Sequence, residues 1–238
     1  MTPPAGLDEH LPHPVRRHVI AVLLVIAVLL VVAAGVALWA ALGGVGPGRV
    51  DRAVLSGAVD ARSLARNDLA VTITTIGNTT AMAVLAALLG AWRWARGRVR
   101  DAVFVVGAMA GAVLVFRGLK ILIDRPRPPA AVQVIAETNE SLPSGHATMS
   151  MVVVGSLVVL GWAGRGVTGR VLMLTAAAVW VGAVGGTRVY LGVHWFSDVI
   201  AGWLVGAAWL ALCAVVRSRW RARAATPVAQ VGAEELWP

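Results

Sequence analysis

Six stretches of the sequence are almost entirely apolar, and the polar residues gather in the segments between them. The apolar stretches cover approximately residues 19–42, 69–92, 102–123, 147–163, 171–187 and 196–216. Each is close to the ~20 residues that an α-helix needs to cross a hydrocarbon layer of ~30 Å. The pattern therefore predicts an all-α, polytopic membrane protein with six transmembrane helices.

The composition agrees with this prediction. Apolar residues make up 58% of the 238-residue chain and charged residues 14%, whereas a water-soluble domain carries about 25% charged residues. This composition disfavours a soluble enzyme, a nucleic-acid-binding protein and a disordered chain. The single cysteine, Cys213, can form neither an intrachain disulfide nor a paired-cysteine zinc motif.

The net charge of +9 comes from arginines clustered beside the apolar stretches, which is typical of membrane topology rather than of a nucleic-acid surface. Because positively charged flanks face the cytoplasm, we expect a multi-pass plasma-membrane protein with both termini in the cytoplasm. Its expected partner is the lipid bilayer, with no nucleic acid. The twelve arginines that set this orientation are Arg16, Arg17, Arg93, Arg96, Arg98, Arg100, Arg165, Arg170, Arg217, Arg219, Arg221 and Arg223.

The pattern divides the chain into a membrane domain and two tails. We expect a disordered cytoplasmic N-terminal tail over 1–17, a six-helix membrane domain over 18–217, and a basic then acidic cytoplasmic tail over 218–238. The first apolar stretch exceeds the 7–15 residues of a signal-peptide core and predicts a retained anchor. The first loop, 43–68, is interpreted either as a short amphipathic helix on the outer surface or as an ordinary polar loop.

Three polar stretches at the ends of the predicted helices are the candidates for chemistry, because an ionisable group inside a bilayer costs roughly 2.5–3.5 kcal/mol. By the predicted topology all three lie on the outer face of the membrane. They are KILIDRPRP at 120–128, SLPSGH at 141–146 and TRVYLGVHWFSD at 187–198.

The first stretch places cations where the third predicted helix ends. Lys120 and Asp124 are one turn apart, and prolines then hold Arg125 and Arg127 near the interface. Guanidinium groups bind two phosphate oxygens at once, and an ammonium group adds a point charge. The alternative is that these side chains simply reach the lipid headgroups.

The second stretch predicts the N-terminus of the fourth helix. Ser144 is a natural N-cap, Gly145 allows close approach of a ligand, and the exposed amides favour an anion. His146 would lie beside that anion with a proton to donate. A plain serine cap followed by an interfacial histidine is the alternative.

The third stretch pairs an imidazole with a carboxylate. His194 and Asp198 are four residues apart, which on a helix places them on one face. The carboxylate could then hold the tautomer that leaves the other ring nitrogen free to attack. Arg188, near the end of the fifth helix, can face the same point. The alternative is that these groups contact only headgroups and water.

Together the three stretches favour a single polyanion site outside the bilayer. The only lysine lies in them, as do both histidines that are distant from the N-terminus. One shared site explains Lys120, Arg125, Arg127, His146, Arg188, His194 and Asp198.

In order and spacing the stretches resemble the three signature motifs of the type 2 phosphatidic acid phosphatase superfamily, the lipid phosphate phosphatases. Two positions depart from the pattern: Thr187 stands where serine is usual, and Phe196 stands where many relatives have proline. The second departure predicts a less rigid start of the last helix. The motifs are Lys120-x6-Arg127-Pro128, Pro143-Ser144-Gly145-His146 and Arg188-x5-His194-x3-Asp198.

The resemblance implies that residues 18–217 are a membrane phosphatase domain acting on a lipid phosphate: polyprenyl diphosphate, phosphatidic acid or phosphatidylglycerophosphate. It implies that His194 forms a phosphohistidine, Asp198 orients it and His146 protonates the leaving oxygen. The residues implied to bind phosphate are Lys120, Arg127, Ser144, Gly145 and Arg188.

No metal and no cofactor are expected, because magnesium-dependent phosphoryl transfer needs carboxylates at the site. The carboxylates near the predicted site are those of Asp124 and Asp198. A weak role of Glu137 and Glu140 in metal binding stays open. Two alternatives to hydrolysis remain: a phosphotransferase that uses a lipid or sugar hydroxyl as acceptor, and a non-enzymatic anion-binding transporter or structural membrane protein.

Overall fold

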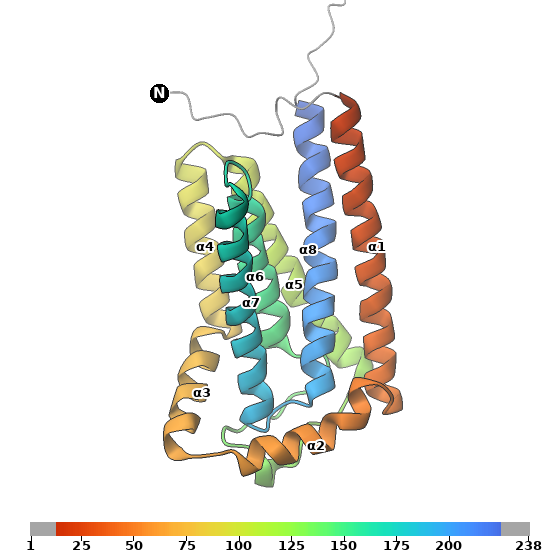
Figure 1. Ribbon diagram of the computed structural model, residues 1–238, viewed down its shortest axis with the longest axis vertical. Helices are drawn as coiled ribbons and strands as arrows, with labels where there is room; N and C mark the ends of the chain where they lie inside the picture. The colour runs from red at the N-terminus through yellow and green to blue at the C-terminus, as the bar shows by residue number, and fades with distance from the viewer. Residues whose placement is uncertain (1–12, 225–238) are drawn as a thin grey trace, which may run out of the picture.

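The computed structural model describes residues 13–224 as a bundle of α-helices with no β-strand in that range (Figure 1). The predicted all-α class is confirmed. A short 3₁₀ turn, Ala130–Val132, interrupts the loop between the fifth and sixth helices. The α-helices are α1 His13–Gly43, α2 Pro47–Asp60, α3 Leu64–Ile76, α4 Thr79–Ala95, α5 Val99–Ile123, α6 Gly145–Gly161, α7 Val167–Tyr190 and α8 Phe196–Ala224.

Two helices extend past the predicted bounds of the membrane domain, 18–217, and those bounds stay a prediction. Helix α1 begins at His13, inside the predicted tail 1–17, and α8 continues to Ala224, beyond residue 217. Alanine and arginine are strong helix formers, so the basic segment prolongs α8. The disorder predicted for residues 1–12 and 225–238 lies outside the described residues.

The predicted count of six membrane spans is not established by the helices. Among the described residues, α1, α5, α7 and α8 are each long and apolar enough to cross a bilayer, whereas α6 has only 17 residues. The predicted second span, 69–92, is broken into α3 and α4, which meet at an angle of 43°. The break has a local cause: Asn78 caps α4 by accepting a hydrogen bond from the Ala81 amide at 2.7 Å. Four helices, or five counting the bent pair, therefore qualify.

The first loop contains a helix. Pro47 stands in the first turn of α2, where its missing amide is not needed. The helix runs across one end of the bundle (Figure 1) and buries Asp51 and Leu55. The helical interpretation of loop 43–68 is thus confirmed, and its place on the outer membrane surface stays a prediction.

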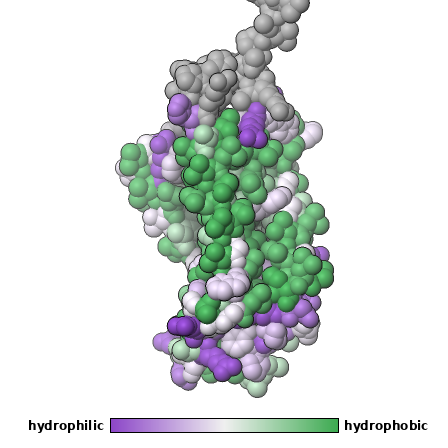
Figure 2. All heavy atoms as spheres, turned by 90° about the vertical axis from the view of Figure 1, so that its right-hand side faces the viewer, coloured by the Kyte–Doolittle hydropathy of each residue, from purple (hydrophilic) through white to green (hydrophobic). Residues whose placement is uncertain are grey.

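The bundle is apolar outside as well as inside. Figure 2 shows a band of hydrophobic side chains along the molecule, with hydrophilic residues gathered toward its ends. Helix α1 exposes Val22, Val25 and Leu29, as expected where lipid takes the place of water. Inside, α4, α5 and α6 share a core that includes Met82, Val105 and Met149.

Helices α6 and α8 approach closely because α8 carries glycines at the contact. A Cβ added at Gly202 would lie 2.7 Å from the Ser144 carbonyl oxygen, and one at Gly206 would lie 2.8 Å from that of Thr148. Such contacts are too short for any side chain, so glycine alone permits this separation. The start of α6 is thereby held against the first turns of α8.

Candidate active site

The three polar stretches meet at the end of the bundle that α2 crosses. A cavity of about 380 Å³ opens between them. Six of the eight predicted site residues contribute to its wall, whereas Ser144 and Asp198 are fully buried behind it. The wall consists of Thr79, Phe116, Arg117, Lys120, Ile121, Arg127, Glu137, Asn139, Glu140, Gly145, His146, Arg188 and His194.

The end of α5 contributes two cations to the cavity. Lys120 lies in the last turn and donates a hydrogen bond to the Glu140 carbonyl. Arg127 follows the helix and donates through Nε to the Asn139 carbonyl at 2.6 Å and through Nη1 to the Val193 carbonyl. Burial lowers the pKa of the Arg127 guanidinium, and the carboxylate of Glu137 opposes this shift. Backbone carbonyls thus fix both cations in the wall of the cavity.

Ser144 forms the predicted N-cap of α6. Its Oγ accepts a hydrogen bond from the Ala147 amide at 3.5 Å, and its own amide donates to the Asp198 carbonyl at 3.0 Å. The second bond ties the start of α6 to the first turn of α8. Gly145 and His146 then border the cavity, and a Cβ at Gly145 would lie 3.1 Å from the ring of Phe116.

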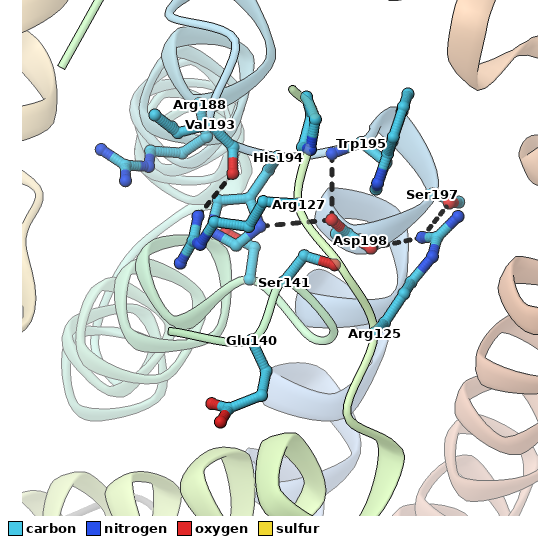
Figure 3. Close-up of polar contacts among 12 residues, drawn as sticks. Arg125, Arg127, Glu140, Ser141, Arg188, Val193, His194, Trp195, Ser197 and Asp198 are labelled. Atoms are coloured by element: carbon cyan, nitrogen blue, oxygen red, sulfur yellow. Dashed lines mark hydrogen bonds and ion pairs between the residues drawn. The ribbon is translucent and has the colours of Figure 1, made fainter. Parts of the chain in front are cut away.

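His194 and Asp198 form the predicted pair, with Nδ1 and Oδ2 3.3 Å apart (Figure 3). The expected helical stacking is wrong, because α8 begins at Phe196 and His194 lies in the turn before it. Gly192, at φ 73°, permits that turn. The Trp195 amide also donates to Asp198 Oδ2, at 2.9 Å.

Burial, followed by the nearby cations Arg127 and Arg188, lowers the pKa of His194 well below its ordinary value. The imidazole is 1% exposed and is therefore neutral at physiological pH. With Nδ1 donating to Asp198, the lone pair of Nε2 remains available.

Arg125 is not part of the cavity wall, contrary to the expectation that it shares the polyanion site with Arg127. Its guanidinium turns toward α8 and α2: Nη1 donates to Asp198 Oδ1 and to Ser197 Oγ, the latter at 2.8 Å, and Nη2 donates to Asp51 at 2.9 Å. Two carboxylates attract it in that direction. The other six residues assigned to the shared site lie at the cavity or, for Asp198, directly behind it.

Glu137 is a site residue without a defined role in the sequence prediction. Its Oε1 lies 2.5 Å from Arg188 Nη2 and its Oε2 lies 3.8 Å from Arg127 Nη2. Arg188, which is 1% exposed, also donates to Thr74 Oγ1 at 2.8 Å. Among the described residues no group of three or more histidine, cysteine, aspartate or glutamate side chains could hold a metal ion.

Asp51 and Ser197 also adjoin the catalytic pair, although the sequence did not indicate them. An acidic residue one turn from Leu55, on the buried face of an amphipathic helix, is the signal that could have pointed to Asp51. Ser197 stands inside the third motif, where its contact with Asp51 depends on a segment 146 residues away.

Comparison with known families identifies the family of the chain. The model of the PAP2 superfamily matches residues 101–222, just over half of the chain. The chain belongs to the PAP2 superfamily. The resemblance of the three motifs is confirmed, because all of them lie within the matched region.

Two known proteins are similar in sequence. Phosphatidylglycerophosphatase B of Bacillus subtilis (strain 168) is 28% identical over 159 residues, covering 66% of this chain and 77% of the relative. Undecaprenyl-diphosphatase of Sulfolobus acidocaldarius is 37% identical over an alignment of 86 residues that covers 33% of this chain and 34% of the relative.

Two solved structures share the fold. The crystal structure of a transmembrane PAP2-type phosphatidylglycerolphosphate phosphatase from Bacillus subtilis has a TM-score of 0.67 at 25% identity and covers 79% of this chain and 94% of that one. Aquifex aeolicus LpxE has a TM-score of 0.55 at 18% identity, over 71% and 95% of the two chains. With its apolar helices and these relatives, this PAP2 chain is a membrane protein.

Proposed function

We propose that this PAP2 protein is a membrane lipid phosphate phosphatase that works through a phosphohistidine on His194. The observation that carries the proposal is the shared cavity: His146 and His194, which are 48 positions apart in the sequence, border it together with Lys120, Arg127 and Arg188. A transporter or structural protein needs cations to bind an anion, but it needs neither a buried neutral imidazole nor a carboxylate that orients it.

In the proposed first step, Nε2 of His194 attacks phosphorus while the bond from phosphorus to the leaving oxygen breaks. His146 gives its proton to that oxygen, so the lipid product leaves as an alcohol or as a monophosphate. Asp198, hydrogen-bonded to Nδ1, stabilises the positive charge that His194 gains. In the second step His146 takes a proton from water and the water oxygen attacks phosphorus while the bond from phosphorus to Nε2 of His194 breaks, so that inorganic phosphate leaves and His194 is again neutral.

The cations supply the electrostatic part of the proposal. Lys120, Arg127 and Arg188 surround the cavity and would bind the non-bridging oxygens, whose charge grows in the transition state. The buried Nε of Arg188 has no hydrogen-bond partner among residues 13–224 and can donate to a phosphate oxygen. Gly145 borders the cavity with its backbone, and Ser144 acts through the N-cap that exposes the first amides of α6.

The substrate class follows from the relatives and the surroundings. One similar protein is a phosphatidylglycerophosphatase and another an undecaprenyl-diphosphatase, and the cavity lies at the end of an apolar bundle. We therefore propose a phosphomonoester or diphosphate of a membrane lipid as substrate: polyprenyl diphosphate, phosphatidic acid or phosphatidylglycerophosphate. Metal-independent hydrolysis on the extracytoplasmic side completes the proposal.

The test uses the full-length protein in detergent with EDTA and a panel of ³²P-labelled polyprenyl diphosphate, phosphatidic acid and phosphatidylglycerophosphate. We expect free phosphate and an acid-labile phosphoprotein from the wild type. His194→Ala should abolish both, and His18→Ala, a histidine on the exposed surface of α1, should not. Near-normal phosphate release by His194→Ala would overturn the mechanism. Label in a lipid or sugar product would identify a phosphotransferase instead.

A further inference from the structure

Asp51 of α2 is a buried carboxylate that the proposed chemistry does not use. It is 4% exposed and lies in the first half of a helix that precedes the family-matched region. Its Oδ1 accepts from the Ser197 amide at 2.8 Å, and its Oδ2 accepts from Ser197 Oγ at 2.6 Å and from Arg125 Nη2 at 2.9 Å. Both partners also adjoin Asp198, so every hydrogen bond of Asp51 leads toward the catalytic pair.

The bond to the Ser197 amide caps α8 from outside. Helix α8 begins at Phe196, so the Ser197 amide is in the first turn, where backbone donors lack partners within the helix. A carboxylate at that position satisfies a donor and interacts favourably with the helix dipole. The departure from the family motif at Phe196 predicted a less rigid helix start, and that rigidity stays a prediction. The contact with Asp51 ties this start to α2.

Arg125 extends the same contact to the carboxylate of Asp198. Its Nη1 donates to Asp198 Oδ1, whereas Asp198 Oδ2 faces His194 Nδ1 and the Trp195 amide (Figure 3). The two oxygens of Asp198 are thus held from opposite sides. Since the other end of the guanidinium is paired with Asp51, the position of α2 determines where Arg125 holds Asp198.

We propose that Asp51 and Arg125 are positioning residues for the His194–Asp198 pair, acting through the start of α8 and through Oδ1 of Asp198. The inference rests on the proposed role of His194. Neither residue borders the cavity, so both affect the phosphoryl-transfer step rather than phosphate binding. The catalytic centre of this chain therefore includes a carboxylate from outside the matched region 101–222.

The test measures single-turnover formation of phosphohistidine from short-chain ³²P-labelled phosphatidic acid, by rapid quenching into alkali. Asp51→Ala should lower the rate constant of phosphohistidine formation by about 10- to 100-fold, the usual effect of a small misplacement of reacting groups. The amplitude of phosphohistidine formation and the inhibition constant for vanadate should both stay within about twofold of the wild-type values. Asp51→Asn should recover part of the rate, because its amide oxygen still accepts from the Ser197 amide whereas its NH₂ group cannot accept from Arg125. Asp60→Ala, at the exposed end of the same helix, is the control.

The other outcomes have separate meanings. A lower amplitude with an unchanged rate constant in both Asp51 variants means that Asp51 only maintains the fold, and it overturns the inference. A weaker vanadate inhibition with an unchanged rate constant places Asp51 in phosphate binding and also overturns it. If the wild type forms no phosphohistidine from phosphatidic acid, polyprenyl diphosphate or phosphatidylglycerophosphate, the proposed function fails first. Arg125→Lys should slow the same step. A planar guanidinium can pair with two carboxylates at once, whereas the ammonium group of lysine cannot hold both in that geometry.

Discussion

At the scale of single residues, the two histidines at the cavity differ in surroundings. His194 is 1% exposed and hydrogen-bonded to Asp198, whereas His146 is half-buried and borders the cavity. One imidazole is thus fixed in orientation and the other can face a leaving group. This difference matches the proposed roles of nucleophile and general acid.

Replacing His146 with alanine should separate the two steps of the reaction. With a lipid phosphate, His146→Ala should lower kcat by roughly 10² to 10⁴, the usual contribution of a general acid. With p-nitrophenyl phosphate the leaving group needs no proton, so phosphorylation should persist and phosphohistidine should accumulate. Rapid-quench measurements with both substrates check this. An equal loss of the phosphorylation rate on both substrates would contradict the general-acid role.

Glu137 should compete with the substrate for Arg188. Its carboxylate is 2.5 Å from the guanidinium, and a phosphate dianion next to it would be repelled. Glu137→Gln keeps a hydrogen-bond acceptor without the charge, so the inhibition constant for vanadate should fall by about 3- to 10-fold, which corresponds to roughly 1 kcal/mol. Glu140→Gln, from the same loop, should change it less. A rise of this constant in Glu137→Gln would mean that the carboxylate supports Arg188 rather than competing for it.

Titration of His194 should make the protein less stable in acid. Its ordinary pKa is 6.5, and burial lowers the pKa in the folded protein well below that value. Below pH 6.5 the unfolded chain therefore binds a proton that the folded chain does not, and the free energy of unfolding falls as the pH falls. Thermal unfolding in detergent should show a smaller acid-induced loss of Tm for His194→Gln than for the wild type. Equal losses would place the responsible titration elsewhere.

At the scale of elements, the contact between α6 and α8 aligns the catalytic groups. The Ser144 amide reaches the Asp198 carbonyl only because Gly202 and Gly206 let the two helices approach. Small residues serve this purpose in membrane helices, where apolar burial gives little preference for one neighbour over another. The separation of the helices is therefore set by packing.

Adding a methyl group at Gly206 should destabilise the bundle. The new Cβ would lie 2.8 Å from the Thr148 carbonyl oxygen, and such overpacking costs about 1–3 kcal/mol. Thermal unfolding of Gly206→Ala in detergent should occur at a lower temperature. Gly107→Ala is the matched control, because nothing lies within 4 Å of its Cβ and alanine favours a helix. Equal melting of the two variants would show that α6 and α8 can separate freely.

At the scale of the whole molecule, the two ends carry different charge patterns. At the end with the cavity, carboxylates and cations are both present in the ion pairs. At the opposite end a single carboxylate, Asp101, pairs with three arginines, Arg93, Arg217 and Arg221, at 3.5, 2.8 and 3.3 Å. The arginine-rich end corresponds to the predicted cytoplasmic side. The extracytoplasmic position of the cavity follows from this predicted orientation and stays a prediction.

This orientation, together with six crossings, can be tested by cysteine labelling in a Cys213→Ala background. A membrane-impermeant maleimide should label Ser56→Cys on α2 in intact cells. It should label Arg98→Cys, before α5, and Ala163→Cys, after α6, only in opened cells; all three positions are exposed. Labelling of Ala163→Cys from outside would mean that the short helix α6 does not cross. Labelling of Arg98→Cys alone in intact cells would reverse the orientation.

The sequence by itself determined the class of the fold, the three motifs and the family. Apolar stretches, a helix-capping serine and the spacing of Lys120, His146 and His194 are local or linear features, so they can be recognised without a structure. Six of the eight predicted site residues accordingly meet at one cavity. The sequence predicted the helical continuity of 69–92 incorrectly, because Asn78 has a capping side chain whose effect is masked by the apolar residues around it.

Tertiary structure alone decided which way the long polar side chains point. Arg125 and Arg127 are two residues apart, yet one pairs with Asp51 and the other faces the cavity. The direction of a flexible guanidinium depends on where its partners lie, and those partners come from α2 and from the loop before α6. Only the packing of α2 across the end of the bundle brings Asp51 to Ser197, because hydrophobic patterning specifies which face of a helix is buried but not what that face contacts.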